Sequence, residues 1–253
     1  MKKQIIFRMD DAGASSKQFE VYSNFFLGNF LFLKYLSVFA AWGSYQELTA
    51  QAWEEILEIL GKFEAKMTVA VTAAWVEEDG KWVAFPKKFP KQAEILKKGV
   101  SQKLLEIANH GLTHCVVGKH LPLLFSSNRK FHREFWSWVP KEVHYQNLEA
   151  SQKILEDYFG EVVTFVPPGN VWTKDTEIAA AKFGLKFLCT NLPKFETGQK
   201  SNSLTYIADS NTFAFHDRDI VKNGINWLEE KIFEFKEKDF DVTAVENFAR
   251  GLK

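Results

Sequence analysis

Cysteine is scarce in this chain, and neither sign of charge dominates it. Only Cys115 and Cys189 occur among 253 residues, which argues against a disulfide framework and favours a reducing compartment. Lysine plus arginine equal aspartate plus glutamate at 32 each, so the composition gives no support for a nucleic-acid or anionic-membrane partner. The sequence also lacks internal repeats and Gly/Ser-rich linkers. We therefore expect one globular domain over residues 1–253.

No apolar run is long enough for a membrane span. The most aromatic stretch, residues 25–39, contains Asn29 and Lys34 and is shorter than the roughly 20 apolar residues that a spanning helix needs. We expect it to pack on the core. A flap over the active site, or a docking surface with peripheral membrane contact, stays open as an alternative. Residues 1–4 lead directly into a strand pattern without the apolar segment of a secretory signal, so a cytoplasmic location is expected. The sequence does not indicate an oligomeric state.

Short apolar segments alternate with amphipathic ones along the chain. Helices are expected between the apolar segments, beginning with one that Thr49 would cap. This alternation predicts an α/β protein with a parallel sheet, and the length favours a single (β/α) barrel, distorted or incomplete, over an open sheet. The segments expected to form strands are residues 4–9, 67–72, 162–166, 185–188 and 212–215.

Two carboxylates stand side by side at the end of the first expected strand. Asp10 and Asp11 repel each other unless a cation or a proton shares their site. One of them can bind a metal while the other takes a proton from the attacking water. A solvated Asp-Asp turn before Gly13 is the alternative.

His110 and His114 are separated by four positions, which on a helical turn would place both imidazoles on one face and within reach of one metal. A structural role for the pair is an equal alternative. A nearby carboxylate favours the metal, because catalytic zinc commonly has three protein ligands and one open position. Asp11 would be the third ligand if the strands meet as proposed. His216, between apolar residues at a late strand end, is by itself also typical of a core histidine.

The order of these motifs resembles that of the NodB-type polysaccharide deacetylases of carbohydrate esterase family 4. The resemblance extends from residue 5 to about residue 235, and residues 65–69 resemble the second strand of that family. The segments that carry it are residues 8–11 (Arg-Met-Asp-Asp), 110–114 (His-Gly-Leu-Thr-His), 166–169 (Val-Pro-Pro-Gly) and 213–216 (Phe-Ala-Phe-His).

This resemblance implies a barrel of the NodB type and the metal-dependent removal of an N-acetyl group from a sugar or a glycan precursor in surface-polysaccharide biosynthesis. The cofactor would be a divalent metal, with zinc as the expected ion. The implied residues are Asp11, His110 and His114 as metal ligands, Asp10 as general base, His216 as general acid, and Pro168, Gly169 and Trp172 beside the substrate and the oxyanion.

Several positions depart from the family pattern. The third motif usually begins with an arginine that orients the catalytic aspartate, but this chain has Val166 there. The Asp-x-x-Trp of the fourth motif is not evident around residues 188–191, and Gly111 stands where Ser or Thr is usual. These departures leave two alternatives open, namely hydrolysis of another C–N bond, such as that of a cyclic amide, and a glycan-binding homologue without catalysis.

Two arginines are candidates to replace the missing third-motif arginine. Arg8 lies two residues before Asp10, so on a strand the two side chains share one face. An arginine within a core strand also needs a partner. Arg133 is the other candidate. It lies in a segment with His120, His132, His144, Trp136 and Trp138, which we expect to be either part of the core or an aromatic wall beside the sugar.

Overall fold

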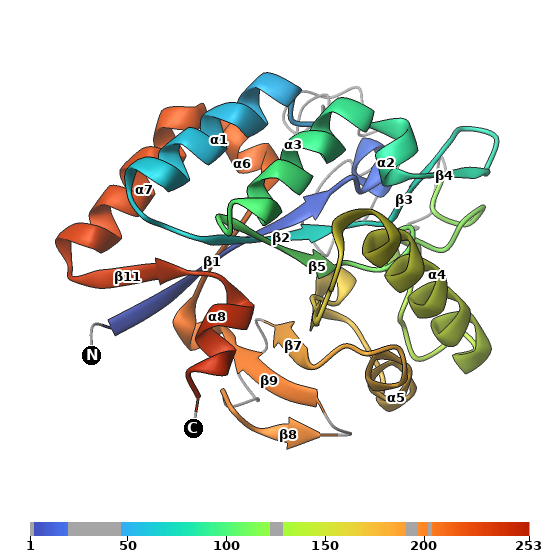
Figure 1. Cartoon of the computed structure of the whole chain (residues 1–253). Coiled ribbons are helices and arrows are strands. Elements are labelled where there is room, and N and C mark those ends of the chain that lie inside the picture. Colours follow the sequence, from blue (N-terminus) through green and yellow to red (C-terminus); the bar gives the residue numbers. More distant parts are fainter. Residues whose placement is uncertain (1–2, 20–46, 122–128, 191–196, 202–203, 253) are drawn as a thin grey trace.

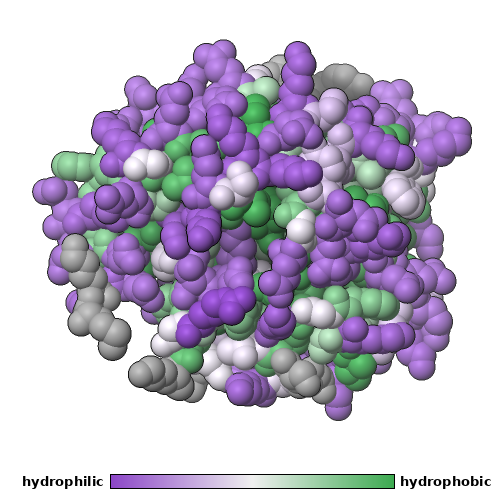
Figure 2. Space-filling model, viewed as in Figure 1, coloured by the Kyte–Doolittle hydropathy of each residue, from purple (hydrophilic) through white to green (hydrophobic). Residues whose placement is uncertain are grey.

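The computed structural model describes residues 3–19, 47–121, 129–190, 197–201 and 204–252 (Figure 1). The aromatic stretch at residues 25–39, with the flap and membrane-contact hypotheses attached to it, lies outside these ranges. None of the helices in the described ranges is long and apolar enough to cross a membrane. Hydrophilic side chains cover most of the face in Figure 2, with apolar patches between them.

A curled, mostly parallel sheet forms the centre of the molecule. Its strands are paired in the order β10-β1-β2-β5-β6-β7-β9-β8, and β11 also pairs with β1. The terminal pair β8–β9 is antiparallel. The strands are β1 (Lys3–Ala12), β2 (Met67–Val71), β5 (Leu105–Asn109), β6 (Thr164–Phe165), β7 (Phe187–Thr190), β8 (Lys200–Ser201), β9 (Leu204–Ala208), β10 (Thr212–His216) and β11 (Phe240–Thr243). A separate hairpin consists of β3 (Ala74–Val76) and β4 (Trp82–Ala84).

Within the described residues no pairing joins β9 or β8 to β10, so the barrel does not close. The expected α/β class and incomplete barrel are confirmed, although the strands have shifted bounds. The residue Thr49 caps α1 as expected, because its hydroxyl accepts the N–H of Ala52 at 3.1 Å.

Helices cover the outer face of the sheet, and α1, α3 and α7 lie side by side over it (Figure 1). The helices are α1 (Ala50–Lys62), α2 (Phe85–Lys88), α3 (Pro90–Ser101), α4 (Lys141–Phe159), α5 (Lys174–Lys182), α6 (Asp217–Asn223), α7 (Ile225–Glu237) and α8 (Val245–Arg250). Short 3-10 turns are η1 (Ser15–Phe19), η3 (Arg129–His132), η4 (Pro168–Asn170) and η5 (Asp209–Asn211).

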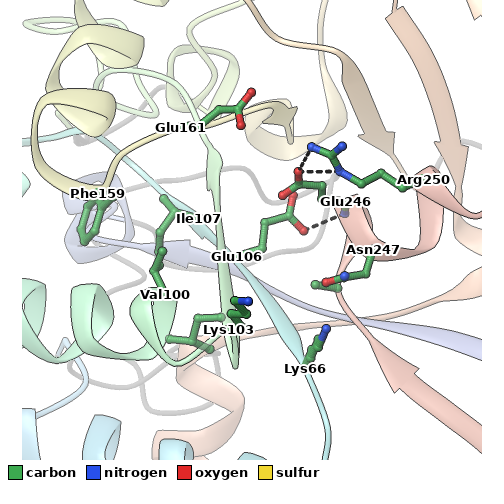
Figure 3. Close-up of a pocket in the computed structure, with 12 residues that line it drawn as sticks. Lys66, Val100, Lys103, Glu106, Ile107, Phe159, Glu161, Glu246, Asn247 and Arg250 are labelled. Atoms are coloured by element: carbon green, nitrogen blue, oxygen red, sulfur yellow. Dashed lines mark hydrogen bonds and ion pairs between the residues drawn. The ribbon is translucent and has the colours of Figure 1, made fainter.

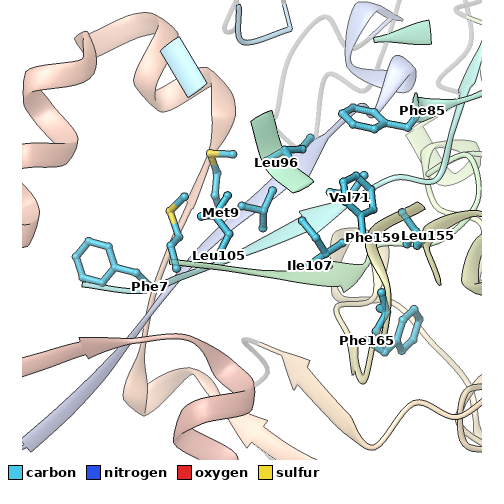
Figure 4. Close-up of a cluster of buried hydrophobic side chains, with 14 of the residues drawn as sticks. Phe7, Met9, Val71, Phe85, Leu96, Leu105, Ile107, Leu155, Phe159 and Phe165 are labelled. Carbon is cyan, nitrogen blue, oxygen red and sulfur yellow. The ribbon is translucent and has the colours of Figure 1, made fainter. Parts of the chain in front are cut away.

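Side chains of β1 alternate between two cores. Phe7 and Met9 pack with the outer helices (Figure 4), whereas Ile6 faces the barrel interior together with one side of α8. Because α8 fills one end of the barrel, its first N–H groups are buried. The Glu106 carboxylate accepts one of them, from Glu246 at 2.9 Å. The same alternation places Arg8 and Asp10 on the interior face.

Candidate functional site

Asp10 and Asp11 lie at a β-bulge near the end of β1. The pairing with β2 shifts register between Met9 and Ala12, so two residues of β1 stand opposite one residue of β2. Adjacent side chains of a regular strand point to opposite faces. Asp11 instead has a left-handed backbone with φ of 72°, which re-aims its side chain. The bulge therefore lets two consecutive carboxylates serve the same end of the barrel.

Three expected metal-ligating side chains come together at this end. Oδ1 of Asp11 lies 3.0 Å from Nε2 of His110 and 3.2 Å from Nε2 of His114, and all three residues are buried. Burial by itself raises the pKa of Asp11. When protonated, His110 and His114 donate to its carboxylate, and these hydrogen bonds, with the charges of His114 and His216, outweigh burial and hold that pKa well below its usual range.

The loop that carries the histidine pair is not helical. The expectation of a helical turn over residues 110–114 was wrong, because β5 ends at Asn109 and the chain then turns sharply. Gly111 and His114 have φ of 79° and 59°, and the Asn109 side chain accepts the N–H of Gly111 at 2.9 Å. This turn brings the two imidazole rings to 5.0 Å between centroids, so the pair converges without a helix.

The donor set fits a divalent metal. Nδ1 of His110 lies 2.7 Å from the Val166 carbonyl oxygen, which can only accept, so Nδ1 carries the proton. The lone pair of Nε2 then faces the Asp11 carboxylate, and two electron-rich atoms at 3.0 Å need a cation or a second proton. Nδ1 of His114 lies 3.0 Å from Ser16 Oγ, a hydroxyl that can donate or accept, and this contact orients the ring. The ligand atoms of the three residues lie within 4.8 Å of one another, as a zinc site requires.

Arg8 holds the other aspartate. Its side chain is fully buried, and Nε and Nη2 donate to the two carboxylate oxygens of Asp10, each at 2.8 Å. Nη1 donates to Sγ of Cys189 on β7 at 3.1 Å. Of the two candidate arginines, Arg8 therefore contacts Asp10. Arg133 lies elsewhere, with its Nε 3.4 Å from the carbonyl oxygen of Gly169.

His216 lies across from Asp10 in the β1–β10 pairing. Its Nε2 is 3.9 Å from Oδ2 of Asp11, and its Nδ1 is 3.5 Å from Oδ2 of Asp219. Asp219 also accepts the backbone N–H of His216 at 2.8 Å, as part of the capping box that starts α6. Burial lowers the pKa of His216. The hydrogen bond with Asp219 and the charges of Asp11 and Asp10 raise it by more, so the pKa lies above its ordinary value.

The family resemblance did not predict a role for Asp219, because it places the fourth-motif aspartate near residues 188–191. The spacing from His216 to Asp219 is that of a helix N-cap and its third residue, and this signal was present in the sequence.

Two glycines allow the second and third motifs to pack against residues 133 and 134. A Cβ at Gly111 would lie 1.7 Å from Oε1 of Glu134, and a Cβ at Gly169 would lie 2.1 Å from Nε of Arg133. Glu134 is buried and accepts the N–H of Thr113 at 3.3 Å, and its burial raises the pKa of Glu134 to about 7. Glu134 thus fills the space that a side chain at position 111 would need, which fits a glycine where the family resemblance led us to expect Ser or Thr.

Of the three residues expected beside the substrate, Pro168 and Gly169 lie in the third-motif turn η4, and Trp172 contacts α5. Pro168 is buried against Gly111, so the third-motif turn adjoins the histidine loop. Gly169 has φ of 57° in η4. Trp172 is half-buried and donates its indole N–H to Glu177 of α5 at 2.9 Å.

The three extra histidines are buried. Nε2 of His132 lies 3.0 Å from the carbonyl oxygen of His120, and Nδ1 of His144 lies 2.9 Å from Oγ1 of Thr176. These contacts support the core alternative for the histidines. Trp138, in contrast, is 42% exposed.

A pocket of about 550 Å³ lies at the opposite end of the barrel (Figure 3). Lys66 and Glu161, which precede β2 and β6, line it together with Arg250 of α8. The lining contains charged groups of both signs, and Arg250 pairs with Glu246. The carboxyl ends of the strands, where β/α barrels carry their functional groups, are therefore distinct from this pocket.

The family model for polysaccharide deacetylase matches residues 42–188, more than half of the chain. The chain belongs to the polysaccharide deacetylase family. The matched span contains His110, His114 and the third-motif turn. Asp10, Asp11 and His216 lie outside it, and the fold brings them to the histidine pair.

Solved structures of this family have the same fold. A polysaccharide deacetylase from Mycobacterium smegmatis, described as putative, has a TM-score of 0.58 and 15% identity, covering 98% of this chain and 89% of that one. A family 4 carbohydrate esterase from Streptomyces lividans, in complex with acetate, has a TM-score of 0.52 and 10% identity, covering 95% and 91%.

A third similar structure is a family 4 pseudoenzyme from Bacillus anthracis, with a TM-score of 0.54 and 14% identity, covering 98% of this chain and 66% of that one. A mutant of it has restored enzymatic activity. At these identities the similarity shows the fold alone. No curated protein sequence matches the chain.

Proposed function

We propose that this chain is a metal-dependent hydrolase that removes an N-acetyl group from a sugar or a glycan precursor, acting as one domain over residues 1–253. The observation that carries the proposal is the orientation of His110. The Val166 carbonyl fixes its Nδ1–H and leaves Nε2 facing Asp11 in a buried group with His114.

Asp11, His110 and His114 would hold a divalent metal, and zinc suits this ligand set. The chemistry that such an ion supplies is polarisation of the acetyl carbonyl and activation of water. Asp10 takes the proton of the attacking water, and Arg8 fixes the orientation of its carboxylate through two hydrogen bonds.

His216 donates a proton to the amine nitrogen as the C–N bond breaks. Its Nε2 faces the Asp11 side of the site, while its Nδ1 faces Asp219. A partner of this kind orients an imidazole and favours its protonated form. Asp219 therefore orients His216 from α6 and favours its protonated form.

A binding protein without catalysis is the second candidate. It is favoured by the similarity to a pseudoenzyme and by Val166 at the third-motif position. The Arg8–Asp10 contact speaks against it, because a guanidinium still holds the aspartate that would act as base.

Metal analysis and acetate release test the proposal together. The purified chain is analysed for bound metal and incubated with N-acetylated oligosaccharides, nucleotide-linked and lipid-linked N-acetyl sugars, and a cyclic amide. We expect near-stoichiometric metal and release of acetate, with release by Asp10→Asn slower by roughly 100- to 10,000-fold. Glycan binding without turnover would support the second candidate, and turnover of the cyclic amide alone would support hydrolysis of another C–N bond. Absence of metal binding would overturn the proposal.

A further inference from the structure

The turn η1 follows the first motif directly and contains a lysine that the proposed chemistry does not use. Lys17 is only 3% exposed, although lysines are almost never buried unless they are paired. Its Nζ donates to the backbone carbonyl of Asp11 at 2.6 Å. It also donates to both carboxylate oxygens of Asp217, at 2.7 and 2.8 Å. One ammonium group thus joins a proposed metal ligand to the residue that follows His216.

We propose that Lys17 is a positioning residue, which fixes the backbone of Asp11 for metal binding and ties it to the His216 strand end. This inference rests on the metal site of the proposed function.

The first argument is the conformation of Asp11. A non-glycine residue in the left-handed region persists only where its surroundings hold it there. Two donors converge on the Asp11 carbonyl oxygen, the N–H of Ala14 at 3.0 Å and Nζ of Lys17 at 2.6 Å. They fix the peptide plane after Asp11, and with it the direction of the carboxylate toward the histidines.

The second argument is the place of Asp217. The pairing of β1 with β10 reaches its last residues at Asp10 and His216, so beyond that point the strand pairing no longer holds the two chain segments together. Lys17 and Asp217 bridge the segments immediately after it. The carboxylate of Asp217 is fully buried and also accepts the N–H of Arg218 at 2.8 Å, so it has one defined place.

The third argument is that η1 also reaches a second proposed ligand. Ser16, next to Lys17, lies 3.0 Å from Nδ1 of His114, and Ser15 Oγ accepts the N–H of Val76 on β3 at 3.1 Å. Consecutive side chains of one short turn therefore contact two of the three ligands and fasten the turn to the hairpin. Residues that support metal ligands in this way commonly change metal affinity by 10- to 100-fold when they are removed.

Zinc affinity tests the proposal without reference to turnover. It is measured by competition with a chelating indicator for the wild type, Lys17→Met and the double variant Lys17→Met/Asp217→Asn, with thermal unfolding of each. Lys62→Met is the matched control, because Lys62 pairs with Glu229 on the surface with its side chain 64% exposed. We expect roughly 10- to 100-fold weaker zinc binding by both Lys17 variants and no change in the control.

The double variant separates positioning from mere charge pairing. It leaves no unpaired buried charge, so a purely structural ion pair predicts that stability and zinc affinity both return to wild-type values. Positioning predicts that stability recovers while zinc affinity stays low, because the Asp11 carbonyl still lacks its ammonium donor. Wild-type zinc affinity in the folded double variant overturns the inference alone. Absence of zinc binding by the wild type overturns the proposed metal site, and the inference with it.

Discussion

The guanidinium of Arg8 donates hydrogen bonds to both carboxylate oxygens of Asp10, which lies two residues later on the same strand, at 2.8 Å for each contact. The period-two geometry of β1 makes this possible, because residues i and i+2 share a face. Arg8 thus makes the contact with Asp10 that the family resemblance assigned to an arginine at position 166. Because Arg8 is fully buried, its charge needs a counterion inside the barrel, and Asp10 is that counterion.

We expect Arg8→Met to lower turnover by about 100-fold while metal content stays near normal, because the base would lose its orientation but the metal ligands would remain. Arg8→Lys should recover only part of the loss, since an ammonium group cannot make the two parallel contacts. Turnover and elemental analysis of the same preparations check this.

Arg250→Met is the control for that experiment, because Arg250 pairs with Glu246 at the surface. Near wild-type turnover in Arg8→Met would transfer the orienting role to another donor.

The two aspartates should give opposite phenotypes. Asp11→Asn, His110→Ala and His114→Ala each remove a proposed ligand and should abolish metal binding, together with the rise in melting temperature that added zinc produces. Asp10→Asn should keep the metal and lose roughly 100- to 10,000-fold in turnover.

His144→Ala is the matched control for those variants, since His144 is a buried histidine whose Nδ1 lies 2.9 Å from Oγ1 of Thr176. An exchange of the two aspartate phenotypes would reverse the assigned roles.

Asp219→Asn should move the alkaline limb of the pH–rate profile to lower pH. A general acid works only while it is protonated, so activity falls as the pH rises through the pKa of His216. The carboxylate of Asp219 is a cause that raises this pKa, and its removal lowers the pKa. The profile is measured as kcat against pH, with Asp79→Asn as the control because Asp79 pairs with Lys81 at the surface. An unchanged limb would mean that Asp219 serves only to cap α6.

Gly111→Ser should destabilise the fold by roughly 2–4 kcal/mol, because its Cβ would collide with Oε1 of Glu134 and its backbone would stay left-handed. Gly80→Ser isolates the backbone contribution, since Gly80 has the same φ of 79° and a Cβ there would meet only Val117 Cγ1, at an ordinary 3.9 Å. The double variant Gly111→Ser/Glu134→Ala should be more stable than Gly111→Ser. Chemical denaturation measures all three, and equal stability of Gly111→Ser and the wild type would refute the packing argument.

The sequence by itself determined the α/β class, the incomplete barrel, the family and the set of candidate ligands. These depend on local patterns, namely short apolar segments that alternate with amphipathic ones, strand ends that carry Asp10, Asp11 and His216, and the spacing of His110 and His114. The reach of Arg8 to Asp10 was also local, since two positions along a strand fix a shared face.

Only the tertiary structure decided how these groups meet. The bulge that turns Asp11 toward the histidines depends on the register between β1 and β2, and the histidine pair converges through left-handed residues rather than a helical turn. The partnership of Lys17 with Asp217 joins residues 200 positions apart. Burial requires such pairs, because a charge removed from water is costly unless a counterion lies beside it. Which counterion that is depends on the folded chain, and the number of residues between two charges in the sequence does not predict it.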